Sequence, residues 1–310
     1  MKLKIDFTIP TNQIDGKWPS FFTIGSCFAD SQASRMMSLG MEVYSNPYGI
    51  VYNPVSIKQI LERSVTSKPY TTQDFEQRES VFSWEHHGDF KYLSIADAVS
   101  ESNAILTETV AQLAHAEVII ITYGTSLVYT HDKNIVANCH KVPNREFEQK
   151  QLRFLEVKES IQQTLRHIST LNPTAQVVFT VSPVRHLRSG VSESSRSKAI
   201  LIGALHEVLD ETQNNHHSYF PSYEIFMDEL RDYRFAKADM THPTEQAEEY
   251  IWDRFCETYF SKETLQIVED VKKYTQLAAH RPIHSAELHK MHVSEKLKTL
   301  QKNYPFLNFK

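Results

Sequence analysis

Short apolar runs alternate along this chain with longer segments whose apolar residues recur at helical spacing. Such runs are typical of buried parallel strands, and the segments between them are typical of amphipathic helices. The predicted strands are residues 21–25, 41–44, 117–123, 176–181 and 219–220. The predicted helices are residues 28–39, 55–63, 96–115, 148–171, 193–213 and 245–259. This alternation predicts an α/β fold with a parallel sheet flanked by helices.

Two regions fall outside the alternation. Residues 80–85 and 90–93 are candidates for an extra hairpin around His86, His87 and Gly88. From residue 262 onward the pattern is charged and helical, with a break at residues 280–282. We therefore expect one α/β domain over residues 1–261. Residues 262–310 are predicted to form a C-terminal helical extension with a role in packing or in an oligomer.

Composition narrows the classes of partner. The chain has 310 residues, is 41% hydrophobic and carries a formal net charge of -5, with its basic residues scattered. This favours neither nucleic acid nor an anionic membrane surface as a partner. No apolar stretch approaches the ~20 residues of a membrane span, and the N-terminal lysines precede no apolar signal core. Three widely spaced cysteines, Cys27, Cys139 and Cys256, suit a reducing compartment, so we expect a cytoplasmic protein.

A hydroxyl and a thiol stand where the first predicted strand gives way to a helix. Ser26 and Cys27 follow Gly25 directly. Ligands of parallel α/β sheets bind at the carboxyl ends of the strands, so Ser26 is a candidate nucleophile. Cys27 is a second candidate, because a helix N-terminus favours a thiolate. Its simpler interpretation is a small buried residue packed on the sheet.

A serine needs a base, and the base needs an orienting partner. Of the 15 histidines, only His242 has an aspartate three residues earlier, Asp239. This spacing lets the carboxylate reach one imidazole nitrogen while the other points outward. Taken alone the pattern is weak, because a helix cap beside a surface histidine would look the same.

The order of these blocks resembles the SGNH, or GDSL-like, hydrolase superfamily, and within it the GSCFA family. Residues 25–29 read GSCFA, and NPYGIVYNP at 46–54 resembles the second block of that family. The stretches ITYGT at 121–125, TVSPV at 180–184 and DMTHP at 239–243 resemble its later blocks. The resemblance implies a three-layer, flavodoxin-like fold and a serine esterase.

The resemblance also implies roles for individual residues. Ser26 would be the nucleophile, His242 the general base, and Asp239 the group that orients His242. The oxyanion donors would be the backbone N–H groups of Ser26 and Gly49, with a hydroxyl from a third block. That block departs from the usual Gly-x-Asn of the superfamily, because it reads Gly124-Thr125-Ser126. Thr125 or Ser126 would have to replace the missing asparagine.

Several residues near the predicted strand ends are candidate substrate contacts. They are Asn46, Gly124, His140, Ser182, Arg185 and His186. A guanidinium there is suited to a carboxylate or phosphate of the substrate, although solvated charge explains it equally well. His140 fits a substrate contact or a surface turn. The neighbouring pairs His86-His87 and His216-His217 lack a third ligand, so we expect no metal site.

Two functional hypotheses remain at this stage. In the first, the chain is an esterase or acyl transferase acting on a small-molecule or carbohydrate ester without a cofactor. In the second, the missing asparagine marks a catalytically weak carbohydrate- or ligand-binding module. A hydrogen bond between Ser26 and His242 would favour catalysis, whereas a packed edge with His242 turned away would favour binding.

Overall fold

A five-stranded parallel sheet forms the centre of the molecule. The computed structural model describes residues 5, 7–280 and 285–307 of the chain. In spatial order the strands are β2 (Val43–Ser45), β1 (Phe21–Gly25), β5 (Val118–Tyr123), β9 (Gln176–Val181) and β10 (His217–Phe220). All four pairings are parallel. The predicted three-layer α/β architecture is confirmed, with the strand order of a flavodoxin-like sheet.

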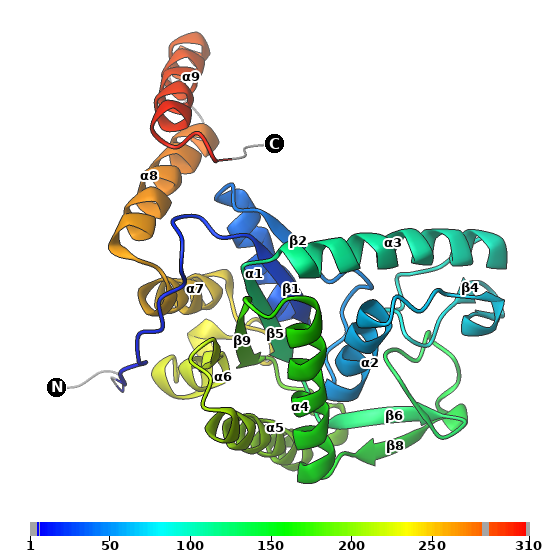
Figure 1. Cartoon of the computed structure of the whole chain (residues 1–310). Coiled ribbons are helices and arrows are strands. Elements are labelled where there is room, and N and C mark those ends of the chain that lie inside the picture. The colour runs from blue at the N-terminus through cyan, green and yellow to red at the C-terminus, as the bar shows by residue number, and fades with distance from the viewer. Residues whose placement is uncertain (1–4, 6, 281–284, 308–310) are drawn as a thin grey trace.

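Helices cover both faces of this sheet (Figure 1). On one face lie α1 (Cys27–Ser38) and α7 (Glu245–Tyr259); on the other lie α2 (Pro54–Val65), α3 (Ile95–His115), α4 (Phe154–Leu171) and α5 (Val191–Thr212). Successive residues of β5 pack into the hydrophobic cores on opposite faces of the sheet. Ile119 and Ile121 face the second group of helices, and Ile120 faces the first. All six residues of β5 are buried, which explains its unbroken apolar sequence.

Smaller strands form two additions outside the central sheet. β3 (Glu76–Gln77) pairs with β4 (Val81–Phe82), and Val81 also bridges Tyr92, so the predicted hairpin region is partly confirmed. The second addition is a sheet of β7 (Asn134–Val136), β6 (Leu127–His131) and β8 (Glu148–Gln151). The helix predicted from residue 148 was placed too early. Its first residues form the polar strand β8, whose side chains give no apolar signal, and α4 begins at Phe154.

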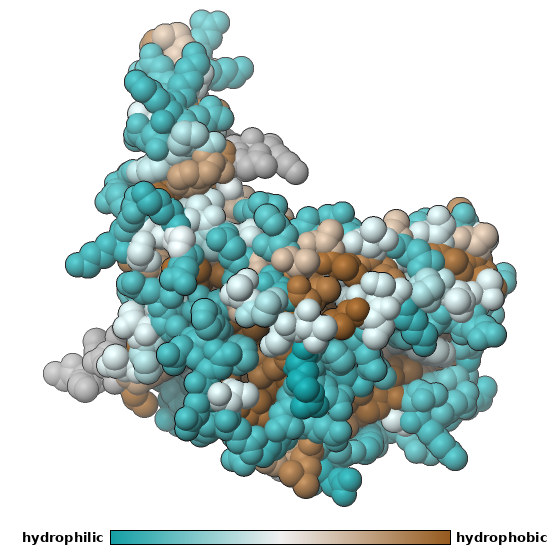
Figure 2. Space-filling view, in the orientation of Figure 1, coloured by the Kyte–Doolittle hydropathy of each residue, from teal (hydrophilic) through white to brown (hydrophobic). Residues whose placement is uncertain are grey.

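The chain after β10 contains short helical turns and two long helices. The short elements α6 (Ser222–Glu224), η4 (Ile225–Glu229) and η5 (Tyr233–Phe235) precede the loop that carries His242. After α7, helices α8 (Lys262–Ala279) and α9 (Ala286–Asn303) project from the body (Figure 1). Most of the visible surface of this projection is hydrophilic (Figure 2). Residues 281 and 282 of the predicted break lie outside the described residues.

Candidate active site

Ser26 lies at the carboxyl edge of the sheet, between β1 and α1. It is the residue that precedes the first turn of α1, and its backbone N–H donates to the Thr122 carbonyl at 3.1 Å. Gly25 makes this turn possible because its φ is +149°, and a Cβ there would lie 2.2 Å from the Thr122 oxygen. The close approach of β1 to β5 thus fixes the position of Ser26.

The hydroxyl of Ser26 is not used for capping. A serine at this position usually accepts a hydrogen bond from the first turn of its helix, but the Ser26 side chain forms none. The residue is 2% exposed, and within the described part of the chain its Oγ has no hydrogen-bond partner. A buried hydroxyl normally finds a partner, so the free Oγ is a feature that needs a functional explanation.

Asp239 and His242 form a close pair in the loop before α7. The His242 Nδ1 lies 2.6 Å from Asp239 Oδ2, and the backbone N–H groups of Thr241 and His242 both donate to Asp239 Oδ1 at 2.9 Å. These backbone donors, followed by the imidazole, hold the pKa of Asp239 well below its ordinary value. The carboxylate therefore stays ionised and orients the ring through Nδ1, which leaves Nε2 for other chemistry.

The two halves of the proposed triad are not hydrogen-bonded to each other. Because the Ser26 Oγ has no partner among the described residues, it is not bonded to His242. The side chain of His242 is 42% exposed, whereas that of Ser26 is enclosed. The structure therefore brings Asp239 and His242 together but leaves a further movement to join them to Ser26.

The backbone candidates for the oxyanion hole already have acceptors. The N–H of Ser26 donates to Thr122, as described above. That of Gly49 donates to the Asn46 carbonyl at 2.7 Å. Gly49 has a φ of +75°, and a Cβ there would lie 2.4 Å from the His87 Cβ, so close packing explains this glycine as well. Either group would have to exchange its acceptor for a substrate oxygen.

The third-block hydroxyls are bonded to helix α5. Thr125 Oγ1 lies 2.8 Å from Ser197 Oγ, and the Ser126 Oγ donates to the Ser197 carbonyl at 3.1 Å. Both residues are buried. In this arrangement they tie the end of β5 to α5, and service as oxyanion donors would require these bonds to break.

Asn46 supports the turn of Ser26 from the neighbouring strand. Its Oδ1 accepts from the Gly25 N–H at 2.7 Å, and its Nδ2 donates to Asp30 Oδ1 at 2.6 Å. Asn46 is buried and has a φ of 42°, a left-handed conformation that asparagine tolerates better than most residues. Sequence reasoning treated Asn46 as a candidate substrate contact and missed Asp30.

Tyr52 and Lys198 were also missed, although both lie among the candidate residues. The Tyr52 ring packs against Gly124, where a Cβ would meet it at 2.9 Å, and stacks on His186 with ring centroids 4.9 Å apart. Lys198 donates to the Ser182 carbonyl at 2.6 Å. A lysine within the buried face of a predicted helix was the signal that could have identified Lys198.

Cys27 and His140 have surroundings that favour packing. Burial is the main cause that raises the pKa of the Cys27 thiol, and this disfavours a thiolate nucleophile. His140 stacks on Phe82 with centroids 4.2 Å apart, and burial lowers its pKa to about 4. No group of three or more metal-ligating side chains occurs within the described ranges.

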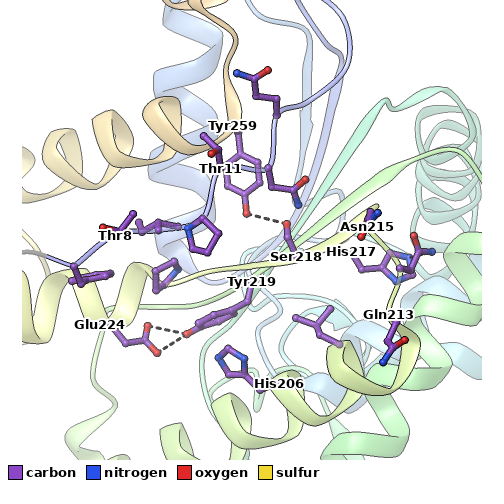
Figure 3. Close-up of a pocket in the computed structure, with 18 of the residues that line it drawn as sticks. Thr8, Thr11, His206, Gln213, Asn215, His217, Ser218, Tyr219, Glu224 and Tyr259 are labelled. Carbon is purple, nitrogen blue, oxygen red and sulfur yellow. Dashed lines mark hydrogen bonds between the residues drawn. The ribbon is translucent and has the colours of Figure 1, made fainter.

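A separate cavity of about 1210 Å³ lies at the edge of the sheet, between β10 and the N-terminal segment (Figure 3). The Tyr219 hydroxyl there donates to the Glu224 carboxylate, with its oxygen 2.9 Å from each carboxylate oxygen. Its described lining does not include Ser26, Asp239 or His242.

The helices were also compared with the requirements of a membrane span. Within the described ranges, none combines the length and the apolar character that crossing a membrane requires.

Comparison with known proteins gives one family match. The model of the GSCFA family matches residues 20–255. No curated protein sequence matches the chain. Among solved structures, the acetyl xylan esterase Est2A from the rumen bacterium Butyrivibrio proteoclasticus is similar with a TM-score of 0.38 and 11% identity. That match covers 83% of this chain and 64% of the esterase chain, which is less than two thirds of its length.

Proposed function

Because the chain belongs to the GSCFA family, we propose that it is a serine-dependent esterase or acyl transferase. Its substrate would be an acyl ester of a carbohydrate or another small alcohol. The observation that carries the proposal is the free hydroxyl of Ser26 at the carboxyl edge of β1. The preformed Asp239–His242 pair supports it, since a nucleophilic serine requires an oriented base.

The proposed reaction proceeds through an acyl-enzyme. His242 Nε2 takes the proton of the Ser26 hydroxyl as Oγ attacks the ester carbonyl. The tetrahedral intermediate then collapses, the alcohol leaves with that proton, and the acyl group stays on Ser26. Water or a second alcohol, deprotonated by His242, releases the acyl group and restores the serine. Asp239 remains a carboxylate throughout, in agreement with its lowered pKa.

Two local changes are needed before this reaction. His242 must approach Ser26, and donors must turn to the oxyanion. The proposed donors remain the N–H groups of Ser26 and Gly49, with the hydroxyl of Thr125 or Ser126. Each would exchange a present acceptor for the substrate oxygen. Removing one such donor typically costs a factor of about 10²–10³ in kcat, so a donor that kept its present acceptor would slow the reaction by about that factor.

A second function is supported by the same geometry. Ser26 is enclosed and not bonded to His242, and the four candidate oxyanion donors are all hydrogen-bonded within the protein. These features favour a catalytically weak SGNH-like module that binds a carbohydrate or another ligand. The two functions differ in whether Ser26 can be acylated.

The test is covalent labelling of the intact protein with a fluorophosphonate, followed by mass spectrometry and assays with short-chain aryl esters. The variants are Ser26→Ala, His242→Ala and, as a matched control, Ser160→Ala, a buried serine on α4. We expect an adduct on Ser26 and loss of turnover in the first two variants alone. A folded wild-type protein with neither adduct nor turnover would support the binding module instead.

A further inference from the structure

Three cationic side chains stand near the candidate active site without a carboxylate partner. Arg185, Arg188 and Lys198 form no ion pair with any other described residue. Arg185 and Arg188 come from the segment that follows β9, and Lys198 comes from α5.

Lys198 is the most enclosed of the three. It is 2% exposed, and its Nζ donates to the Ser182 carbonyl at 2.6 Å. The only other described interaction of the amine is with the ring of Tyr223, whose centroid lies 5.4 Å away. An ammonium group has three N–H donors, so one carbonyl and one ring leave its charge poorly compensated. Burying such a charge is costly unless an anion balances it.

Arg185 faces the same problem. Its Nε is buried and has no acceptor among the described residues, although the residue is partly exposed as a whole. Burial is the largest cause that lowers the pKa of Lys198, and the charge of Arg185 lowers it further. Arg185 lies three residues after Ser182, whose carbonyl binds Lys198, so both cations belong to the segment at the end of β9.

The distance from Ser26 to the Ser182 carbonyl, which binds Lys198, follows from the sheet. The N–H of Ser26 bonds the Thr122 carbonyl and the N–H of Ser182 bonds the Tyr123 carbonyl, so the two serines flank the end of β5. Neighbouring strands lie about 4.8 Å apart, so Ser26 and the Lys198 contact at Ser182 are separated by about 10 Å. Tyr52, packed over Gly124 and stacked on His186, lies along this path.

We propose that Arg185, backed by the buried charge of Lys198, forms an anion subsite about 10 Å from Ser26. The ester substrate would therefore carry a carboxylate or phosphate group at that distance from its reacting carbonyl. This inference rests on the proposed esterase function and names its class of substrate. Burial lowers the pKa of Lys198 to about 7, and a bound anion would favour the charged amine again.

The nearby acidic groups do not fill this subsite. Burial lowers the pKa of Lys198, and the charge of Glu224 opposes this only in part. Glu224 forms no ion pair with Lys198 in the described chain, and its carboxylate binds the Tyr219 hydroxyl instead. Asp239 is committed to His242 and to two backbone N–H groups. Neither carboxylate therefore occupies the proposed subsite.

The test compares matched charged and neutral esters. On the acyl side, the pair is mono-4-nitrophenyl octanedioate and the same compound with its free acid methylated. On the alcohol side, 6-acetoxyhexanoate and 6-acetoxyhexyl phosphate are compared with 6-acetoxyhexanamide. For each set we measure the ratio of kcat/KM for the anionic and neutral esters. The variants are Arg185→Gln and, as a matched control, Arg166→Gln on the exposed side of α4.

We expect an anionic ester from one of the two sides to be preferred, and the preference to fall about tenfold or more in Arg185→Gln. The control variant should retain it, and the better alcohol-side substrate tells whether carboxylate or phosphate is favoured. The proposal is overturned if the neutral esters are preferred on both sides, or if Arg185→Gln keeps the wild-type ratio.

A binding measurement separates this proposal from the esterase function. Titration calorimetry of the Ser26→Ala protein uses octanedioic acid monoamide against octanediamide, and hexyl phosphate against hexanol. Anion-selective binding that disappears in Ser26→Ala/Arg185→Gln supports the subsite even if no ester is hydrolysed. Binding that does not distinguish charged from neutral ligands contradicts it, whatever the esterase assays give.

Discussion

At the scale of single residues, the candidate site depends on a few bonds around Ser26. Gly25 allows β1 to approach β5, and Asn46 accepts the Gly25 N–H while donating to Asp30. These contacts are buried, so each broken one costs free energy directly. They set the direction of the Ser26 side chain, since the residue itself forms no side-chain hydrogen bond.

Gly25→Ala is expected to be severely destabilising. The added Cβ would lie 2.2 Å from the Thr122 carbonyl oxygen, and the φ of +149° is strained for any other residue. We expect a loss of at least about 3 kcal/mol in the free energy of unfolding, measured by urea denaturation. Gly190→Ala is the control, because its φ is also positive but no atom lies within 4 Å of the added Cβ. Equal losses in the two variants would refute the steric argument.

Asn46→Ala is expected to lower both stability and the rate of Ser26 labelling. The substitution leaves the Gly25 N–H without its acceptor and removes the donor to Asp30. A loss of about 1–3 kcal/mol in the free energy of unfolding is expected from the unpaired groups. The positioning role predicts that fluorophosphonate labelling of the still-folded variant also slows. Asn103→Ala is the control: it removes hydrogen bonds to the Tyr70 backbone and should not slow the labelling.

At the scale of elements, the additions outside the central sheet are held by aromatic packing. His86 is fully buried and stacks on Tyr48 with ring centroids 4.9 Å apart, while Tyr70 and Phe75 meet its edges. Its Nε2 has no partner among the described residues. The ring therefore packs as an uncharged aromatic group between the hairpin region and the loop after β2.

His86 should make the protein less stable in mild acid. The pKa of His86 is lowered from 6.5 to about 3, and burial is the largest cause of this shift. Between these values the unfolded chain binds a proton that the folded chain does not, so the free energy of unfolding falls as the pH falls. The slope is about 1.4 kcal/mol per pH unit for this one group. His86→Phe should reduce the slope measured by urea denaturation between pH 6 and pH 4; an unchanged slope would contradict the assignment.

At the scale of the whole molecule, the C-terminal helices differ in how they join the body. Ile267, Val268 and Val271 of α8 are buried in the core that also contains α7, whereas Leu300 is the one buried residue of α9 among those described. The proposed domain boundary at residue 262 therefore falls between α7 and α8, although both helices contribute to the same hydrophobic core. Of the two projecting helices, α9 lies farther from the body (Figure 1).

Removal of residues 281–310 tests the proposed oligomer role. This cut keeps α8 in place, so we expect the circular dichroism spectrum to keep its α/β character and urea unfolding to remain cooperative. If α9 holds copies of the chain together, light scattering will show fewer copies per assembly for the shortened protein than for the full chain. An assembly state that does not change would exclude this role for α9.

The sequence predicted the central layers well because the inner strands β1, β5 and β9 are buried along their whole length. It missed β6, β7 and β8: the first two are short and only partly buried, and β8 has no apolar residue. It also identified Asp239 and His242 as a pair, since their contact is local. The bonds of Asn46 and Lys198 join distant segments, and only the fold brings those segments together.

The position of β1 between β2 and β5 has a consequence for synthesis of the chain. Phe21 pairs with Val43 on one side and with Val118 on the other, 97 residues later (118 − 21). At about 5–20 residues per second, a ribosome needs roughly 5–20 s to supply that second partner. During this interval one edge of an apolar strand lacks its neighbour, and such edges attract other chains. The strand that carries the candidate nucleophile is thus also the one that a nascent chain must protect longest.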